Sequence, residues 1–411
     1  MKLKIENLVN YSIISFGLLP IMPNNLTGVL IVIISLTSFI YFLKTPTKKI
    51  LLKPFLINSV LFFALIISLF YSSDLSNAFR KLGPAILIII FPLIFYILLA
   101  KYNIKKKVIY ITLNLFSIST ILFLLLYYIF LFFAPHPDNP ALDYFSIFSF
   151  RKSLIDMPIW GKHPIYLSIF IAISIINVLR IGKISFKKNK LFFYTVLIFQ
   201  SIFIITLLLM SSKAVILSLL VTSIIILYIH SKNKSQTFFI SILIFTFLYI
   251  SILFIPQVNA RFKELFLLKT YSLENLDYRN SSQIHVAIWQ TAIEKIKEAP
   301  VFGYGIGDVK SVLHEGYKDK SPILLKKNYN AHNQYLSIWL GVGIIGFLLL
   351  FYFLIFNYKI AIKNKDYMFI AILIFFSLNF LTENIIERQT GAMLFFFLIN
   401  LFGFYNYKRI E

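Results

Sequence analysis

The sequence lacks cysteine entirely and is poor in charge, because Asp, Glu, Lys and Arg together make up only 14% of its 411 residues. The absence of cysteine excludes disulfide frameworks, thiolate zinc sites, iron–sulfur clusters and cysteine nucleophiles. Acidic residues are the scarcest charged group, with 17 Asp and Glu against 40 Lys and Arg. Since 59% of the residues are hydrophobic, the composition argues against a soluble globular protein and indicates a membrane protein.

Apolar stretches recur along nearly the whole chain. A bilayer core about 30 Å thick needs roughly 20 apolar residues in one helix, and this criterion predicts an all-α polytopic membrane protein of about twelve spans. The spans are expected at 8–22, 26–43, 55–72, 84–100, 108–134, 164–180, 190–211, 213–230, 237–255, 334–357, 367–382 and 390–406. Three parts follow in chain order: residues 1–255 with about nine spans and an outer loop at 135–163, a long extracytoplasmic loop at 256–333, and residues 334–411 with about three spans.

The basic residues are concentrated on alternate loops. One set of loops holds 22 of the 40 Lys and Arg but only three of the 17 acids. Because Lys and Arg prefer the cytoplasmic side, this distribution predicts that both termini are cytoplasmic. The net charge of +23 is then mainly a topology signal, so the sequence gives no reason to expect nucleic acid as a partner.

The long loop contains an amphipathic pattern, with Ile284, Ile288 and Ile296 on one helical face. We expect this helix to begin at a cap provided by Ser281 or Ser282 and to lie on the membrane surface. A glycine-rich turn follows it, and no internal repeat of the kind found in many transporters is visible.

Histidine is the first candidate for chemistry, and five of the six histidines fall on predicted outer loops. His332 ends the long loop directly before a span, within AHNQYLSIWLGVGIIG at Ala331–Gly346. This place suits a base that acts on a lipid-borne substrate. The alternative is that a His-Asn-Gln run merely caps and solvates the helix start. Gly341, Gly343 and Gly346 are interpreted as positions of close helix packing.

Cations at the outer ends of predicted helices form the second candidate. Arg80, Lys213, Arg279 and Arg388 are placed to converge on a diphosphate, where they would stabilise the leaving group without a metal. The alternative for each is an interfacial anchor, which the sequence favours for Lys81. Lys213 lies in a short hairpin between two apolar spans, where a charge is costly and is usually either partnered or functional.

The remaining polar residues give weaker signals. Glu383 is expected to form a structural ion pair with Arg388. The outer loops contain no His-x-x-x-His, Asp-x-Asp or Glu-x-x-His spacing, so we expect metal-free chemistry without a cofactor. Gly303, Gly305 and Gly307 have the spacing GxGxG and follow no predicted strand, which argues against a nucleotide fingerprint.

These motifs occur in a characteristic order. EAPVFGYGIGD at Glu298–Asp308 precedes the Ala331–Gly346 motif, and a Thr-Glu pair follows near the end of the penultimate span. This combination resembles the O-antigen ligase and O-antigen polymerase superfamily of bacterial membrane glycosyltransferases. The resemblance covers roughly the C-terminal third of the chain at motif level. It does not separate ligase from polymerase.

The resemblance implies a metal-independent inverting glycosyltransferase at the bacterial inner membrane. Its donor would be a glycan on undecaprenyl diphosphate, used on the periplasmic face, and its acceptor would be lipid A–core. A polymerase that joins lipid-linked repeat units is the first alternative. A lipid-linked glycan flippase or transporter is an alternative of another class, which the apolar character of the predicted spans disfavours.

The resemblance also implies roles for individual residues. His332 matches the family's essential loop histidine and would deprotonate the acceptor hydroxyl. The family commonly has Ser-Arg where this chain has Ser212-Lys213, so a cation is kept but bidentate phosphate contact is lost. Arg80 and Arg279 match family arginines more loosely. The residues expected to support the site are His163, Asn333, Tyr335 and Glu383.

Overall fold

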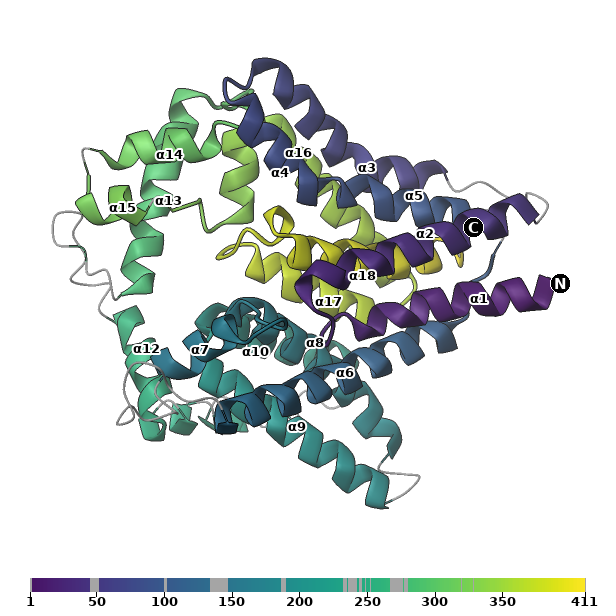
Figure 1. Ribbon diagram of the computed structural model, residues 1–411. Coiled ribbons are helices and arrows are strands. Elements are labelled where there is room, and N and C mark those ends of the chain that lie inside the picture. Colours follow the sequence, from purple (N-terminus) through teal and green to yellow (C-terminus); the bar gives the residue numbers. More distant parts are fainter. Residues whose placement is uncertain are drawn as a thin grey trace. The chain divides into compact units, whose positions relative to one another are not determined.

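The computed structural model describes residues 2–44, 52–99, 102–133, 147–185, 190–231, 235, 242–243, 246–247, 249–251, 253–266, 276, 280–318, 320–327 and 329–410. In these ranges the regular structure is helical, as Figure 1 shows, and no strand occurs in them. The all-α fold predicted from the sequence is therefore confirmed for the described residues. The chain divides into two compact units, residues 1–50 with 97–261 and residues 51–96 with 262–411.

The first unit is a helical bundle in which α8 packs on both α6 and α9. A buried T-shaped contact between Phe116 and Phe170, with ring centroids 5.6 Å apart, joins α6 to α8. The helices lying wholly in this unit are α1 (Lys2–Ser15), η1 (Phe16–Leu18), η2 (Asn24–Leu26), α2 (Thr27–Lys44), α6 (Lys106–Phe133), α7 (Ile147–Asp156), α8 (Pro164–Ser185), α9 (Lys190–Met210) and α10 (Lys213–His230).

The second unit combines an apolar bundle with a smaller helical subdomain. Its helices are α3 (Leu52–Ile67), η3 (Ser68–Tyr71), α4 (Leu75–Ala85), α13 (Ser281–Glu298), α14 (Val309–Tyr317), α15 (Pro322–Lys327), α16 (Gln334–Lys363), α17 (Tyr367–Asn379), η5 (Ile385–Glu387) and α18 (Gln389–Tyr407). Two further helices, α5 (Leu87–Leu99) and α12 (Pro256–Phe266), cross from one unit to the other along the chain.

Three asparagines hold the apolar bundle of the second unit together. The Asn58 side chain donates to Asn400 Oδ1 over 2.9 Å, and the Asn357 side chain donates to Asn58 Oδ1 over the same distance. All three are buried, and they come from α3, α16 and α18. Hydrogen bonds between side chains are favoured inside a membrane, where an unpaired amide would face hydrocarbon. We call this group the amide network.

Seven helical segments among the described residues are long and apolar enough to cross a membrane. Three shorter apolar helices, in 164–180, 213–229 and 367–379, coincide with predicted spans. Nine of the 19 residues in the span predicted at 237–255 lie outside the described residues. The chain is thus a multi-pass membrane protein, while the count of twelve and the orientation of its termini remain predictions.

The helix predicted in the long loop is α13, but its cap and its surroundings differ from the prediction. Asn280, and not Ser281 or Ser282, caps it by accepting hydrogen bonds from two backbone amides at the helix start. Its apolar face packs inside the protein against α14 and α16, where Ile288 and Leu313 are fully buried. The expectation that α13 lies on the membrane surface was therefore wrong, because protein side chains cover the face assigned to lipid.

The glycine-rich turn after α13 docks onto a break in α16. Gly343 has φ +71° inside that helix, and a Cβ there would lie 1.9 Å from the Val301 oxygen. The backbone amides of Tyr304 and Gly305 donate to the carbonyls of Leu340 and Gly341 over 2.8 and 3.0 Å. The close packing predicted for glycine in this segment is confirmed at Gly343, where only glycine tolerates both the conformation and the approach.

Candidate functional site

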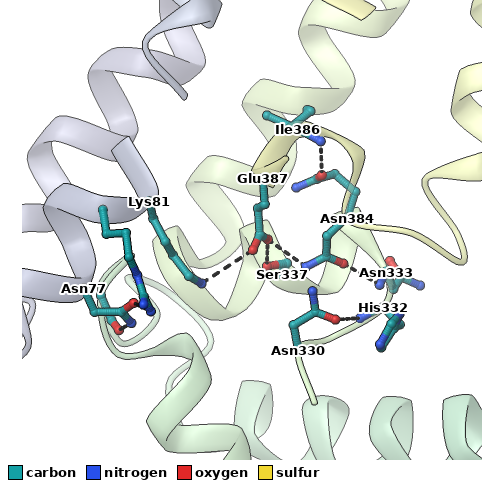
Figure 2. A network of polar contacts seen from close by, with 12 residues as sticks. Asn77, Lys81, Asn330, His332, Asn333, Ser337, Asn384, Ile386 and Glu387 are labelled. Atoms are coloured by element: carbon teal, nitrogen blue, oxygen red, sulfur yellow. Dashed lines mark hydrogen bonds and ion pairs between the residues drawn. The ribbon is translucent and has the colours of Figure 1, made fainter. Parts of the chain in front are cut away.

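The candidate site of the second unit lies where the chain enters α16. His332 has a left-handed backbone conformation with φ +42°, which is uncommon for a residue other than glycine. Its amide donates to Asn330 Oδ1 over 3.3 Å, and its carbonyl accepts from the Trp289 indole over 3.3 Å. The next residue, Asn333, donates its amide to Asn384 Oδ1 over 2.8 Å (Figure 2). Contacts on both sides therefore hold a strained conformation in place.

The imidazole of His332 is packed between other rings. It stacks on His285 with ring centroids 4.8 Å apart, and Tyr329 meets it edge-on at 6.0 Å. The side chain is 26% exposed, yet its Nδ1 atom is buried and has no hydrogen-bond partner among the described residues. Nδ1 lies 4.0 Å from Glu383 Oε2. One ring nitrogen thus points at an acid that is just beyond hydrogen-bond distance.

Burial lowers the pKa of His332 to about 4. The positive charge of Arg388 lowers this pKa further, and the negative charge of Glu387 partly offsets both effects. Burial acts in this direction because it penalises the charged imidazolium. At neutral pH the ring is therefore uncharged and retains one nitrogen that can accept a proton.

A second carboxylate, Glu387, is the centre of a polar network beside this loop. It lies 3.6 Å from the Lys81 ammonium, accepts from the Ser337 hydroxyl, and accepts from the Asn384 amide over 2.8 Å. The three partners come from α4, α16 and the turn before η5 (Figure 2). Because the Asn384 side chain also accepts from the Asn333 amide, the carboxylate is connected to the residue next to His332. We call this group the charged network.

Further hydrogen bonds fix the first turn of α16. The Asn333 side chain caps the helix by accepting from the Leu336 amide over 3.1 Å. The Gln334 side chain accepts from the Ile386 amide over 2.8 Å, and the Tyr335 hydroxyl donates to the Ser377 carbonyl over 2.9 Å. Asn333 thus performs the capping that the sequence offered as an alternative role for this run. Tyr335 supports the site from outside it, by tying α16 to α17.

Of the four predicted cations, Arg80 and Arg388 lie in the second unit. Arg388 is the residue before α18 and acts electrostatically on His332. Arg80 lies on α4 and donates to Asn77 Oδ1 over 2.7 Å. Arg279 is outside the described residues. Lys213 belongs to the first unit, where it is the first residue of α10, so its place is described only within that unit.

His163 also belongs to the first unit and precedes α8. Its side chain is exposed, and its ring lies edge-on to Tyr166 at 6.1 Å. The neighbouring Lys162 is 3% exposed and donates to the Met22 carbonyl over 2.9 Å. Ser168 in the first turns of α8 donates to Ser212, which precedes Lys213. Within the first unit, the structure therefore joins the starts of α8 and α10.

The charged network was not predicted from the sequence. Lys81 was interpreted as an interfacial anchor, and Glu387 was passed over in favour of Glu383. The two side chains are 306 residues apart, so no local pattern connects them. One signal in the sequence could have indicated this network. Acidic residues are scarce in the chain, and a carboxylate at the edge of an apolar span needs a partner. No group of three or more His, Asp or Glu side chains that could hold a metal ion is found in the part of the chain that the structure describes.

Two comparisons with known proteins agree with this picture. Residues 196–351 match the family model described as O-Antigen ligase. A 95-residue segment is 32% identical to an uncharacterized protein of Haemophilus influenzae, and it spans 23% of this chain and 24% of that protein. The matched family segment contains His332, Asn333, Tyr335 and Lys213. The family match supports the resemblance to the O-antigen ligase superfamily that the motifs predicted.

Proposed function

We propose that the chain transfers a glycan from a lipid-diphosphate donor to an acceptor hydroxyl, with His332 as the general base. The observation that carries this proposal is the constrained state of His332. Its backbone is held in a left-handed conformation, and its buried Nδ1 has no hydrogen-bond partner among the described groups. Strain of this kind costs about 1–3 kcal/mol and is characteristic of functional sites. A residue that only capped α16 would need neither feature, because Asn333 caps the helix.

We assign different tasks to the two ring nitrogens. Nδ1 lies 4.0 Å from the Glu383 carboxylate, and we assign it the proton, with Glu383 as the group that orients the ring when substrate is bound. Nε2 is then free to take the proton of the acceptor hydroxyl. The acceptor oxygen attacks the anomeric carbon, the bond from that carbon to the diphosphate oxygen breaks, and the configuration is inverted.

The negative charge of a bound donor explains how His332, with its low pKa, can act as the general base. In the free protein, burial and Arg388 keep the pKa of His332 near 4. A bound diphosphate brings negative charge, which stabilises the imidazolium and raises this pKa towards the working pH. The base is therefore strengthened when the donor is present.

The leaving diphosphate needs cations, and we keep Arg388, Lys213 and Arg279 as the candidates for this task. Arg388 already acts on His332 electrostatically. Lys213 is the first residue of α10, and it takes the place of the arginine that is common in the superfamily. These protein cations would provide the stabilisation that a metal provides in other transferases.

We assign the reaction to the periplasmic face of the bacterial inner membrane, with both termini cytoplasmic. The distribution of Lys and Arg over alternate loops supports this orientation. An undecaprenyl-diphosphate glycan as donor and lipid A–core as acceptor follow from the superfamily. If the acceptor is instead another lipid-linked repeat unit, the same chemistry makes the protein a polymerase.

The test is a lipopolysaccharide gel on cells that lack the gene, rescued with the wild-type chain or with His332→Ala, together with extraction of lipid-linked glycan. Loss of surface polymer with accumulation of polymer on the carrier identifies a ligase, and core bearing single repeats identifies a polymerase. We expect His332→Ala to fail to rescue, because a general base contributes roughly 100- to 10,000-fold. Full rescue by a normally expressed His332→Ala chain would refute the base assignment.

Lys213 permits a sharper test of the diphosphate assignment. Lys213→Arg should keep transfer activity, because it restores the residue common in the superfamily, and Lys213→Ala should lose most of it. Activity is measured on purified chain with the lipid-linked donor. An active Lys213→Ala variant would reduce Lys213 to an interfacial anchor.

A further inference from the structure

An open pocket of about 670 Å³ lies in the second unit, outside the His332 site. Its walls are α4 with the residues before it, and α14 with its C-cap. The side chains lining it are Asp74, Ser76, Asn77, Arg80, Lys310, Ser311, His314, Glu315 and Lys318. Neither the charged network nor His332 contributes to this lining.

The chemistry of the lining is uniformly polar. Arg80, Lys310 and Lys318 provide positive charge, Asp74 and Glu315 provide carboxylates, and the remaining lining residues offer hydroxyl, amide or imidazole groups. None of the described lining residues is apolar. The isoprenoid chain of a lipid carrier would find no apolar side chain in this lining, whereas a hydrophilic anion would find both charge and hydrogen bonds. The volume lies within the range of ordinary ligand sites, roughly 300–1,000 Å³.

The wall that carries Arg80 is held rigidly. Asn77 Oδ1 accepts from the Arg80 guanidinium over 2.7 Å, and the Asn77 side-chain amide donates to the Gly307 carbonyl. The Asp308 carboxylate accepts from the Ser72 hydroxyl and from the Ser73 amide, both over 2.7 Å. Since Asp308 directly precedes α14, these bonds fasten the two walls to each other. A guanidinium held in this way is pre-organised for an anionic ligand.

Arg80 and Lys81 are adjacent on α4, but their side chains lie in different surroundings. Lys81 is 3.6 Å from Glu387 in the charged network, whereas Arg80 lines the pocket. Neighbouring residues of a helix point about 100° apart, so one turn of α4 presents a cation to each region. The placement of Arg80 therefore distinguishes it from the groups around His332.

We propose that this pocket binds an acidic segment of the glycan, meaning sugar residues that carry a carboxylate or a phosphate. Arg80, Lys310 and Lys318 contact the anionic group, and Glu315 and Asn77 contact sugar hydroxyls. This proposal rests on the proposed function only in taking a glycan as the substrate. The donor glycan and the acceptor glycan could each supply such a segment.

Binding is measured on the full chain in nanodiscs with two fluorescent tetrasaccharides, one from hyaluronan with two carboxylates and neutral chitotetraose. We expect the acidic probe to bind at least roughly tenfold more tightly, with an affinity that falls as salt is added. Lys310→Gln and Lys318→Gln should each weaken it by roughly fivefold. Lys297→Gln, which removes an exposed lysine of α13 outside the pocket, should leave it unchanged. Equal binding of both probes, or unchanged binding by the Lys310 and Lys318 variants, overturns the proposal.

Displacement of the acidic probe then shows whether the donor or the acceptor supplies the acidic segment. Displacement by extracted carrier-linked glycan assigns the pocket to the donor, and displacement by lipopolysaccharide core assigns it to the acceptor. If neither displaces the probe, the proposal is refuted. Binding requires no turnover, so His332→Ala should bind the probe normally. The pocket assignment and the proposed reaction can therefore fail independently.

Discussion

The amide network and the charged network of the second unit differ in their chemistry. The first contains only neutral side chains that bind one another, and the second contains charged side chains next to a histidine. In the amide network, Asn58, Asn357 and Asn400 bind one another across three helices with neutral groups. In the charged network, Glu387 gathers Lys81, Ser337 and Asn384. The neighbouring His332 keeps a buried Nδ1 without a hydrogen bond from any described group. The first arrangement joins helices, whereas the second concentrates charge and strain next to a titratable ring.

Both networks use the same helix, on opposite sides of its break. Ser337 precedes Gly343 in α16, and Asn357 follows it. The half of α16 that carries Asn357 packs in the apolar bundle, and the half that carries Ser337 meets the glycine-rich turn. The break at Gly343 thus separates the amide network of the apolar bundle from the candidate site around His332.

The largest effect is expected from Gly343→Ala, because it disturbs both networks. A Cβ at this position would lie 1.9 Å from the Val301 oxygen, on a backbone with φ +71°. We expect a loss of about 2–4 kcal/mol in the free energy of unfolding, together with loss of transfer. Gly83→Ala is the control, since a Cβ on this helical glycine meets nothing within 4 Å. Equal stability of the two variants, by thermal unfolding in detergent, would show that the break is not needed.

Two asparagine variants separate the networks. Asn58→Ala removes two hydrogen bonds between helices and should cost about 1–2 kcal/mol of stability, with transfer per folded molecule unchanged. Asn384→Ala also removes two hydrogen bonds, to Glu387 and from Asn333, but it should reduce transfer. Unfolding curves and single-turnover assays on the same preparations give the comparison. If both variants lost activity only in proportion to stability, the networks would have the same role.

The smallest effect is a shift in pH dependence, and its sign is informative. The neutral form of His332 is the base, so kcat/KM of the free protein should fall as the pH decreases through the pKa near 4. Arg388→Gln removes a positive charge and should move this acidic limb to higher pH. Glu387→Gln removes a negative charge and should move it to lower pH. Shifts in the same direction would contradict the electrostatic assignment of His332.

Local patterns in the sequence predicted much of the fold and the main residue of the candidate site. Apolar run length predicted the described spans, and the spacing of isoleucines predicted α13. His332 was identified by its position between a loop and a span. The predictions of the described spans and of α13 succeeded because each depends on residues close together in the chain, whereas the role of His332 stays a prediction.

What the sequence did not reveal depends on contacts between distant segments. The Lys81–Glu387 pair joins α4 to η5, and no periodicity links the two residues. The surroundings of α13 were misjudged for a related reason. An amphipathic pattern shows that one face is apolar, but it does not distinguish lipid from the side chains of α14 and α16. Asn280 was missed as the cap because Ser281 and Ser282 are equally good capping residues.

The docking of the glycine-rich turn onto α16 has a consequence for how the protein is made. The break frees the carbonyls of Leu340 and Gly341, and the turn at Tyr304 and Gly305 supplies their donors. Hydrocarbon contains no substitute donor, so the first half of α16 is complete only when the turn is in place. The turn leaves the ribosome before α16 does. The turn is therefore already synthesised when α16 is inserted into the membrane. It can donate to the carbonyls of Leu340 and Gly341 before the translocon releases the helix, so these carbonyls do not enter the lipid without hydrogen bonds.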